Sequence, residues 1–582
     1  MNSHDMIRAS LERLAERSVA CWGDIDGVLD ELAAASPDPA LPDFSSGVAF
    51  VTFDYGIDGV SIEIAKYASC LERLLSSAGE TVPVHLVAGE FTERADQVLD
   101  AAWVRHEWPN ANGWAKWDGG EWFARMFYED MPSGSEASRE IAAVIWEQGL
   151  ALAHRLCEVI MNSGVELLVP VNVNSNPGNM ATALAMVIGS ELSGVCVLNS
   201  NHDFYWEGGS VAGEGGVRDH FFRNHANSDF FDVLTRVFPW NGGRWLQMNI
   251  NARQSDTLEA EYGFDRCRLG EVGTAISDAF FRSVSVDERR EKRRAMGCIL
   301  AQGERQSKTV SIDEFIGSMG EWMGHQVPRL LGRVAGTELD FGHDGLVYLL
   351  QPTRVVDRKR IDRDCVLIQA LFTHADFVRR FEESPERRLL LHVSGPVPIE
   401  HQSVLLDVVE AFRELIESLP ESFADRVFLA FSVGTEEHAA MADLGLKRVY
   451  IHDIYKLADL VVFPSETEGR GLPIVESCAS DVPIVCSRYE PEIVFAGVIG
   501  EHLPEEQQIK YSFFPPGSFP EDLLEELTLL LFEPEACQAR FTHNRGAVKS
   551  RYGTTALEVT FRRLLDQLLV DWPAGVEKKA RE

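Results

Sequence analysis

The chain has 582 residues, which is too long for one ordinary hydrophobic core and predicts two large domains with additions. Its 54 Lys and Arg residues stand against 90 Asp and Glu residues, and the net charge of −36 makes nucleic acid and anionic membrane surfaces unfavourable partners. No apolar run reaches the roughly 18 residues of a membrane-spanning helix, so we expect no transmembrane segment.

A helical extension is predicted over residues 1–45. Its apolar positions recur at helical spacing, at Ala9, Leu11, Leu14, Ala15 and Val19. A loop rich in proline and aspartate, from Pro37 to Asp43, ends the extension. The first residues carry no basic segment followed by an apolar one, and the ten cysteines form no CxxC pair. We therefore expect reduced thiols and a cytoplasmic location.

A Rossmann-like domain is predicted over residues 46–285, where short apolar segments alternate with helices. Runs rich in β-branched residues predict buried strands at 47–53, 82–88, 166–171 and 194–198. Strands that alternate with helices in this way imply a parallel, doubly wound sheet.

The alternation fades over residues 286–344, which we interpret as a helical linker or insertion. Its charged run, Glu288 to Arg294, is typical of a solvated helix face. A second Rossmann-like domain is predicted over residues 345–555. Its expected strands are 346–350, 389–393, 427–431, 460–463 and 483–486. An amphipathic helix and a tail close the chain over residues 556–582.

These elements predict an α/β protein in which two doubly wound domains face a central cleft. In such sheets ligands lie beyond the carboxyl ends of the strands, so the cleft is the expected site. Polar side chains that directly follow a predicted strand are therefore the candidates for binding and chemistry.

The most informative segment runs from Asp459 to Val485 and reads as a buried strand, a glycine-rich turn and a helix start. Pro473 suits the first helical turn, where its missing N–H costs nothing. Gly469 and Gly471 let the backbone approach a ligand closely. The free amides at the helix start then predict an anion site.

Two carboxylates flank this predicted anion site, Glu468 before it and Glu476 one turn inside the helix. Carboxylates at such positions are suited to accept hydrogen bonds from sugar hydroxyls on either side of a diphosphate. The alternative is a turn residue and a surface helix residue without a ligand. Their place between a strand, a glycine turn and a helix favours the binding role.

This segment resembles the signature of retaining glycosyltransferases of family 4, in which seven residues separate the two glutamates. Residues 449–459 are similar to the stretch that precedes that signature, and the resemblance covers most of residues 46–570. It implies a GT-B fold with the acceptor in the N-terminal domain and the nucleotide in the C-terminal domain. It also implies Glu468 on the donor sugar, Glu476 on the ribose, and the backbone of Gly471 and Leu472 on the phosphates.

Arg354 and Lys359 leave the carboxyl end of the predicted strand 346–350 in one loop. A diphosphate leaving group needs positive groups to neutralise its charge, and the sequence offers no metal-binding cluster that would supply them. The pair resembles the Arg and Lys with which the family stabilises the departing diphosphate. Arg358 competes for the role of Lys359, and a basic loop that merely balances an acidic protein is the alternative.

Three features of the N-terminal half are further candidates. His202 follows the strand 194–198 and resembles a family histidine that contacts the donor sugar near the reacting carbon. Gly59 resembles the glycine loop that the family places against the donor phosphate and the acceptor. The polar cluster from Asn172 to Asn179 either binds acceptor hydroxyls or caps the following helix.

Two residues depart from the family pattern and bear on the donor sugar. Arg470 stands where the family often has an aromatic residue, and Asp481 where it often has glycine. Two Asp-x-Asp pairs, Asp24 with Asp26 and Asp362 with Asp364, lie in a helical extension and a basic stretch. Neither pair reads as a metal site at the end of a strand.

The resemblance implies transfer of a hexose, mannose or glucose, with retention of anomeric configuration. GDP-mannose or UDP-glucose would be the donor, a small hydrophilic compound such as a compatible-solute glycoside the acceptor, and no cofactor or metal would be required. Transferases of cell-surface polysaccharide or glycolipid synthesis, a nucleotide-sugar epimerase, a glycan phosphorylase and a non-catalytic sensor stay open. A homo-oligomer also stays open.

Overall fold

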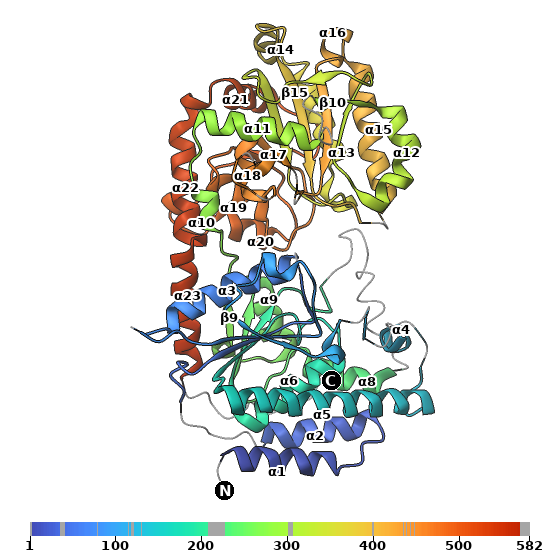
Figure 1. The fold of residues 1–582 in the computed structure, drawn as a ribbon, viewed down its shortest axis with the longest axis vertical. Helices are drawn as coiled ribbons and strands as arrows, with labels where there is room; N and C mark the ends of the chain where they lie inside the picture. The colour runs from blue at the N-terminus through green and yellow to red at the C-terminus, as the bar shows by residue number, and fades with distance from the viewer. Residues whose placement is uncertain are drawn as a thin grey trace. The chain divides into compact units, whose positions relative to one another are not determined.

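The computed structural model describes residues 3–34, 41–56, 58–77, 79–113, 116–117, 121–127, 129, 131–207, 227–300, 307–398, 401–434, 436–437, 439–442, 444–446 and 448–570. The chain divides into two compact units (Figure 1). The first contains Met1–Ala275 and Thr555–Glu582, and the second contains Ile276–Thr554. The predicted loop at Pro37–Pro39 and the tail after residue 570 lie outside the described residues.

The first unit is built on a seven-stranded sheet in the order β5-β3-β1-β6-β7-β8-β9, in which every pairing is parallel. Its strands are β1 (Val48–Val51), β3 (Val84–Ala88), β5 (Val104–Glu107), β6 (Leu167–Pro170), β7 (Cys196–Asn201), β8 (Trp245–Asn249) and β9 (Leu269–Glu271). A two-stranded ladder joins β2 (Asp54–Tyr55) to β4 (Glu90–Phe91). The four predicted strands are confirmed as β1, β3, β6 and β7, whereas β5 and β8 are too polar to show the apolar signal.

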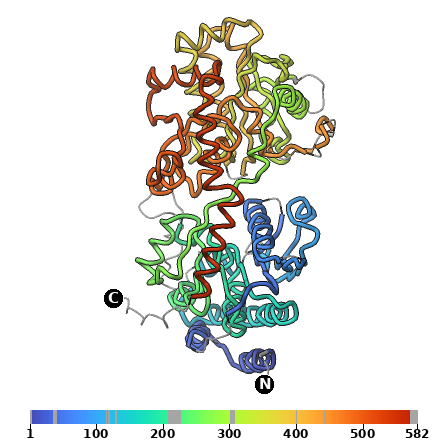
Figure 2. The backbone as a smooth tube through the Cα atoms, turned by 90° about the vertical axis from the view of Figure 1, so that its left-hand side faces the viewer, coloured from blue at the N-terminus to red at the C-terminus, as the bar shows by residue number. Residues whose placement is uncertain are grey.

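Helices of the first unit cover this sheet, and two of them come from the N-terminal extension. They are α1 (Ser3–Ala15), α2 (Trp22–Ala34), α3 (Gly59–Leu75), α4 (Glu121–Phe127), α5 (Glu136–Ser163), α6 (Met180–Ser193), α8 (Ser228–Val237), α9 (Ala252–Tyr262) and α23 (Thr554–Leu568). The extension is two helices rather than one, and their apolar faces join the core around α5 and α6. At the other end of the chain, α23 belongs to the first unit, and its backbone is red in Figure 2. Phe561 of α23 packs edge-on against Tyr67 of α3, with ring centres 5.3 Å apart.

The second unit is built on an eight-stranded sheet in the order β11-β12-β16-β15-β14-β17-β18-β19. All of its pairings are parallel except that between β12 and β16. The strands are β11 (Val310–Ser311), β12 (Arg329–Gly332), β14 (Leu346–Gln351), β15 (Arg388–Ser394), β16 (Val427–Ser432), β17 (Leu460–Phe463), β18 (Ile484–Cys486) and β19 (Ser512–Phe513). The five strands predicted for this half are confirmed as β14 to β18.

The helices of the second unit lie on both faces of this sheet (Figure 1). They are α10 (Asp278–Phe281), α11 (Val286–Leu300), α12 (Ile312–His325), α13 (Asp362–Leu371), α14 (Ala375–Glu382), α15 (Gln402–Ser418), α16 (Glu421–Ala424), α17 (Ala439–Ala442), α18 (Ile451–Leu457), α19 (Leu472–Ala479), α20 (Glu492–Ile499), α21 (Glu521–Phe532) and α22 (Gln538–Tyr552). The α/β class with two doubly wound, mainly parallel sheets, the building blocks of a GT-B fold, is confirmed. The facing of the two sheets across a cleft stays a prediction.

Residues 286–344 differ from the expected helical linker, because their described part belongs to the second unit. Besides α11 and α12 it contains β10 (Ser307–Lys308) and β13 (Glu338–Leu339), which pair with each other, and two strands of the large sheet, β11 and β12. These strands are only two to four residues long, so they leave little period-two pattern in the sequence.

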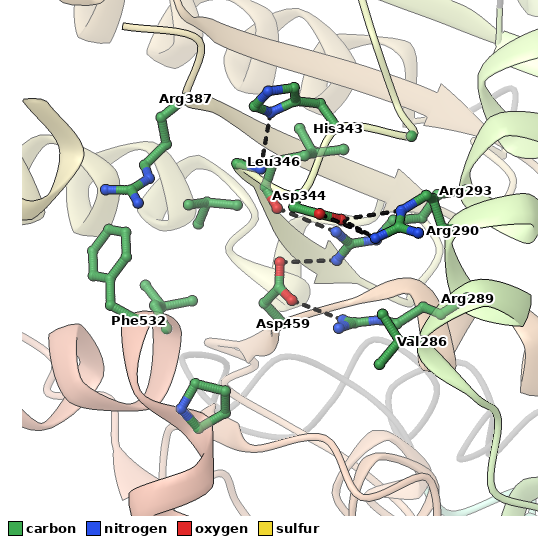
Figure 3. Close-up of a pocket in the computed structure, with 15 residues that line it drawn as sticks. Val286, Arg289, Arg290, Arg293, His343, Asp344, Leu346, Arg387, Asp459 and Phe532 are labelled. Carbon is green, nitrogen blue, oxygen red and sulfur yellow. Dashed lines mark hydrogen bonds and ion pairs between the residues drawn. The ribbon is translucent and has the colours of Figure 1, made fainter. Parts of the chain in front are cut away.

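The charged run of α11 is not a solvated face, and that interpretation was wrong. Lys292 and Arg293 are buried, at 8% and 7% exposure. Lys292 Nζ lies 2.7 Å from Asp453, and Arg293 Nη2 lies 2.9 Å from Asp459, which Arg289 also contacts at 2.7 Å (Figure 3).

These arginines also satisfy the free carbonyls at the end of α18. Arg289 donates to the carbonyls of Lys456 and Ala458, and Arg293 donates to that of Leu457 at 2.6 Å. Cations at a helix C-terminus are favoured because the last carbonyls lack helical partners and carry the negative end of the dipole. The buried face of α11 is therefore charged because it holds both α18 and Asp459, the residue before β17.

Candidate functional site

Adjacent parallel strands bring two of the predicted segments together in the second unit. β14 pairs with β17, so the loop after Gln351 and the turn after Phe463 leave the same edge of the sheet. The amide of Glu466 donates to the carbonyl of Arg358 at 2.8 Å, and the Arg358 guanidinium donates to the carbonyl of Thr467. The two segments therefore form one hydrogen-bonded structure rather than two separate loops.

Lys359 and Glu468 meet at the centre of this structure. Lys359 Nζ forms an ion pair with Glu468 Oε1, and each side chain is 9% exposed. Ser465 Oγ donates to the same carboxylate oxygen, while Arg358 Nη1 lies 3.5 Å from Oε2. Both competing cations, Arg358 and Lys359, thus touch the first glutamate of the motif, a contact that the sequence did not indicate.

Three basic side chains, Arg354, Arg358 and Lys359, follow β14 at this edge of the sheet. Burial lowers the pKa of Lys359 below its ordinary value; the carboxylate of Glu468 opposes this, and the charges of Arg358 and Arg354 add to it. Arg354 is exposed. Arg358 and Lys359 therefore share the Glu468 carboxylate, the charge of Arg354 acts on Lys359, and an anion placed among the three cations would relieve their mutual repulsion.

Helix α19 begins beside this cluster. Its N-cap is Gly471, in the left-handed conformation at φ 58°, and it offers no side chain to the first helical amides. Pro473 occupies the first turn, as the sequence predicted. Uncapped amides at a helix start are donors suited to an anion. The start of α19 and the three cations thus lie on the same turn-and-strand framework.

Gly471→Ala is expected to destabilise the second unit by about 2 kcal/mol, because it combines left-handed strain with overpacking. An added Cβ would stand 2.1 Å from the hydroxyl oxygen of Tyr489, which is 1% exposed. Chemical denaturation measures the loss. Gly59→Ala is the matched control, since a Cβ there meets no atom within 4 Å. Equal stability of Gly471→Ala and the parent would contradict the contact.

Glu476 lies half-buried within α19 and faces Tyr455 of α18. Burial is the main reason why the pKa of the Tyr455 hydroxyl is raised well above its ordinary value, and the nearby charge of Glu476 adds to it. Glu476 is therefore not a fully solvated helix residue. The carboxylate of Glu476 thus lies beside α18, the helix whose C-terminal carbonyls accept hydrogen bonds from Arg289 and Arg293 of α11.

His202 and its neighbours occupy the equivalent edge of the first unit. β7 ends at Asn201, and the Asn172 side-chain oxygen accepts from the amides of His202 at 2.8 Å and Asp203 at 3.2 Å. Asn172 itself adopts φ 58°. Asn179 caps α6 by accepting from the Thr182 amide at 3.0 Å, so this end of the polar cluster serves as a cap.

A buried ladder of amide side chains beneath His202 escaped the sequence analysis. Asn199 and Asn201 donate to Gln247 at 2.8 and 3.2 Å, and Asn201 donates to Asn249 at 2.9 Å. All four side chains have 0% exposure. Amides at alternate positions of adjacent strands lie on one face, so the pairing of β7 with β8 was the missing information.

Gly59 is the first residue of α3, and Asp58 caps that helix through the Ser61 amide at 2.9 Å. Packing does not require a glycine there, which leaves room for close approach by another group. His202 and Gly59 belong to the first unit, whereas Arg354, Lys359, Glu468 and Glu476 belong to the second. Their meeting at one ligand stays a prediction.

Asp481 shows why a glycine is common at its position. It adopts φ 58°, a left-handed conformation that glycine reaches without strain and that Asp tolerates better than most residues. Its carboxylate forms an ion pair with Arg545 of α22. The local structure thus accommodates Asp481 in place of glycine, because the ion pair with Arg545 gives its carboxylate a partner.

Among the described helices, none combines the length and the apolar character that crossing a bilayer requires. The Asp-x-Asp pairs lie in helices, Asp24 and Asp26 in α2, and Asp362 and Asp364 in α13. Asp364 is buried, which raises its pKa well above the ordinary value, and it accepts from Gln351 at 3.2 Å. That carboxyl is therefore part of the packing behind β14.

Residues 443–512 match the sequence profile of the family described as Glycosyl transferases group 1. The sulfoquinovosyl transferase SQD2 of Arabidopsis thaliana is 28% identical over 167 residues, which are 27% of this chain and 29% of that protein. The chain thus spans less than a third of the length of this curated relative.

Two solved structures resemble the chain over most of its length. A glycosyltransferase from Rickettsia africae covers 90% of this chain and 99% of its own, with 12% identity and a TM-score of 0.49. HepE of Anabaena, in complex with UDP and glucose, covers 90% and 99% with 10% identity and a TM-score of 0.48. At these values neither structure bears on the activity or substrates of this chain. The matched residues 443–512 include Glu468, Gly471 and Glu476.

Proposed function

We propose that this chain is a retaining hexosyltransferase that uses a nucleotide-diphosphate sugar, GDP-mannose or UDP-glucose, as its donor. The acceptor is a hydroxyl of a small hydrophilic molecule, in the manner of enzymes that make small glycosides, such as mannosylglucosyl-3-phosphoglycerate synthase. The observation that carries the proposal is the contact of Lys359 with Glu468, a residue that shortly precedes α19 and lies in the segment that matches a glycosyltransferase family.

Each side chain of the cluster has a role in this proposal. Arg354, Lys359 and the amides of α19 bind the diphosphate, and Glu468 accepts from hydroxyls of the donor sugar. Glu476 accepts from the ribose. His202 and Gly59 approach the donor from the first unit. Binding of the anion next to Lys359 would offset the burial that lowers its pKa.

The reaction breaks the bond between the anomeric carbon and the diphosphate oxygen and forms a bond from that carbon to the acceptor oxygen. The acceptor proton passes to the departing diphosphate on the same face, so configuration is retained. Negative charge grows on the diphosphate as the bond breaks, where Arg354 and Lys359 stabilise it. No metal is needed in this scheme.

The test is a panel of nucleotide sugars with different bases and hexoses, offered to the full chain with small hydroxyl acceptors. Product formation with one donor, insensitive to chelator, is expected, and NMR of the product should show the donor's anomeric configuration. Inversion, or activity abolished by chelator and restored by magnesium or manganese, would contradict the mechanism. Binding of every donor without turnover would favour a sensor.

Glu476→Ala is expected to weaken binding of the free nucleotide by about ten- to a hundredfold, because one charge-assisted hydrogen bond contributes roughly 1.5–3 kcal/mol. Calorimetric titration measures the change. Glu492→Ala is the matched control, since that side chain is 71% exposed and lies on another helix. Equal affinity of Glu476→Ala and the parent would remove the ribose role.

A hexose that carries a negative charge is the second candidate for the donor sugar. Arg470, next to the N-cap Gly471, brings a cation to a position where the resembling family often has an aromatic residue. The matched relative in Arabidopsis is named a sulfoquinovosyl transferase. Preference for a nucleotide sulfosugar or uronate in the donor panel, lost in Arg470→Phe, would select this candidate over mannose and glucose.

A further inference from the structure

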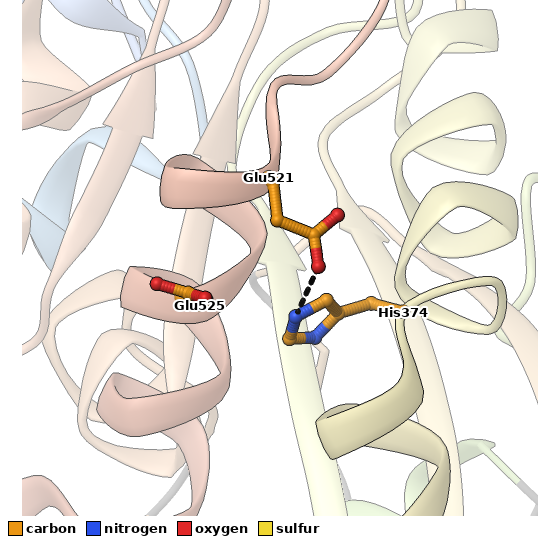
Figure 4. A group of neighbouring side chains, drawn as sticks. All are labelled: His374, Glu521 and Glu525. Atoms are coloured by element: carbon orange, nitrogen blue, oxygen red, sulfur yellow. Dashed lines mark ion pairs between the residues drawn. The ribbon is translucent and has the colours of Figure 1, made fainter.

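A histidine and two glutamates meet on the second unit at the first turns of α21 (Figure 4). His374 lies between α13 and α14 and is 5% exposed. Glu521 and Glu525 are both exposed and stand four residues apart on α21, so they share one face of that helix. One ligand atom from each of the three residues lies within 4.8 Å of the other two.

Thr528 of α21 orients the imidazole of His374. Its hydroxyl donates to the Leu524 carbonyl at 2.6 Å, so its oxygen is free to accept from Nδ1–H of His374, 3.3 Å away. In the neutral ring this tautomer leaves a lone pair on Nε2. Nε2 faces Glu521 Oε1 at 3.3 Å (Figure 4).

Two electron-pair donors that face each other at this distance attract only if a cation lies between them. Zinc binds imidazole nitrogen and carboxylate oxygen at about 2.0–2.2 Å, and tetrahedral angles then separate two ligand atoms by roughly 3.4 Å. The observed 3.3 Å between Nε2 and Oε1 fits that separation. A proton on Nε2, which would make a simple ion pair, is the competing explanation.

We propose that His374, Glu521 and Glu525 bind one divalent transition-metal ion of the zinc type, with Thr528 as the positioning residue. Three protein ligands leave a fourth position for water. A histidine that binds metal through one nitrogen usually donates its other N–H to a fixed acceptor, which Thr528 supplies here. The ion joins the first two turns of α21 to the connection between α13 and α14. It serves the packing of the second unit, apart from the cluster around Lys359.

The proposal is tested on the full chain by equilibrium dialysis against Zn²⁺, and against Co²⁺ with visible absorption of the bound ion. One ion per chain and the intense d–d bands of four-coordinate Co²⁺ are expected. Glu525→Gln should weaken binding by at least about tenfold, and Thr528→Val, which keeps the shape but removes the acceptor, by about 10–100-fold. Asp522→Asn, on the same turn but outside the cluster, is the matched control and should bind like the parent.

Comparison of variants separates this site from metal bound to the ten cysteines. Glu525 is exposed, so its replacement leaves the fold intact. In the parent, removal of the ion should speed up hydrogen exchange at the first turn of α21. Equal affinity of Glu525→Gln, Thr528→Val and the parent would overturn the proposal. Failure of the parent to bind one ion per chain would also overturn it. An imidazolium–carboxylate pair would then explain the contact between His374 and Glu521. Turnover of Glu525→Gln is expected to equal that of the parent.

Discussion

Lys359→Ala is expected to lower turnover by about a hundredfold, on the order of 3 kcal/mol of transition-state stabilisation, with little change in affinity for the intact donor. The ammonium is proposed to meet a diphosphate whose charge grows as the sugar bond breaks. Interactions that strengthen in the transition state raise the rate, whereas uniform binding lowers only the Michaelis constant. Steady-state kinetics with the best donor of the panel measure both quantities.

The ion pair with Glu468 adds a second route by which Lys359 affects the reaction. Removing the ammonium also releases a carboxylate that is 9% exposed and is proposed to hold the sugar. A double-mutant cycle with Glu468→Gln separates the two routes. If Lys359 acted only by positioning Glu468, its replacement would have no further effect in the Glu468→Gln background. A persistent loss of rate in that background would assign Lys359 to the leaving group.

Arg354→Lys and Arg360→Gln complete this experiment. Arg354→Lys should lower turnover as well, because a point charge does not reproduce the planar fork that binds two phosphate oxygens. Arg360 pairs with Glu466 at 2.6 Å and with Asp362 at 3.1 Å, so Arg360→Gln removes a nearby cation outside the proposed site. Normal turnover in Lys359→Ala with only a raised Michaelis constant would reduce the cluster to a substrate-holding patch.

Asp459→Asn is expected to destabilise the second unit by about 3–5 kcal/mol, because breaking a buried ion pair leaves uncompensated charge. Two arginines of α11, Arg289 and Arg293, share this one carboxylate (Figure 3). The same carboxylate accepts from the Tyr348 amide of β14 at 2.8 Å. Denaturant unfolding, followed by hydrogen exchange of β14 and β17, measures the loss and locates it in the second unit.

Asp344→Asn is the matched control, since that side chain pairs with Arg290 of the same helix but is 77% exposed. An exposed pair contributes about 0–1 kcal/mol, so this variant should unfold almost like the parent. Equal stability of Asp459→Asn and Asp344→Asn would show that the ion pairs of Asp459 contribute nothing measurable to holding α11. Replacing Asp459, Arg289 and Arg293 together by apolar residues should restore part of the loss.

The ion pairs of Asp459 also set the pH range over which this carboxylate stabilises the second unit. Burial alone would raise the pKa of Asp459, but the charges of Arg293 and Arg289 outweigh it and hold the pKa below the ordinary value. A carboxyl whose pKa is lower in the folded state contributes its full stability above its unfolded pKa, near 4, and loses it as pH falls through the folded value. The free energy of unfolding of the parent should therefore fall to that of Asp459→Asn only at acidic pH.

Local patterns in the sequence were sufficient for the apolar strands of both sheets, β1, β3, β6, β7 and β14 to β18, and for the start of α19. A strand that is buried on both faces is a continuous apolar run, as β14 and β17 are, and such a run needs no partner to be recognised. Turn and capping chemistry is also local, which is why Gly471 and Pro473 could be placed before the fold was known. Short or polar strands such as β12 and β8 lack this signal.

Tertiary structure decided how the charged residues are used. The run in α11 looked solvated because its partners Asp453 and Asp459 lie more than 160 residues away, at 161 for Lys292 and 166 for Arg293. The ion pair of Lys359 with Glu468 likewise spans 109 residues. Whether a charge is buried depends on a partner that comes near only after the strands have paired, because an unpaired charge would stay in water. The sequence alone determined which residues are charged and where the apolar strands and the turn before α19 lie, and the pairing of β14 with β17 brought Arg358 and Lys359 into contact with Glu468.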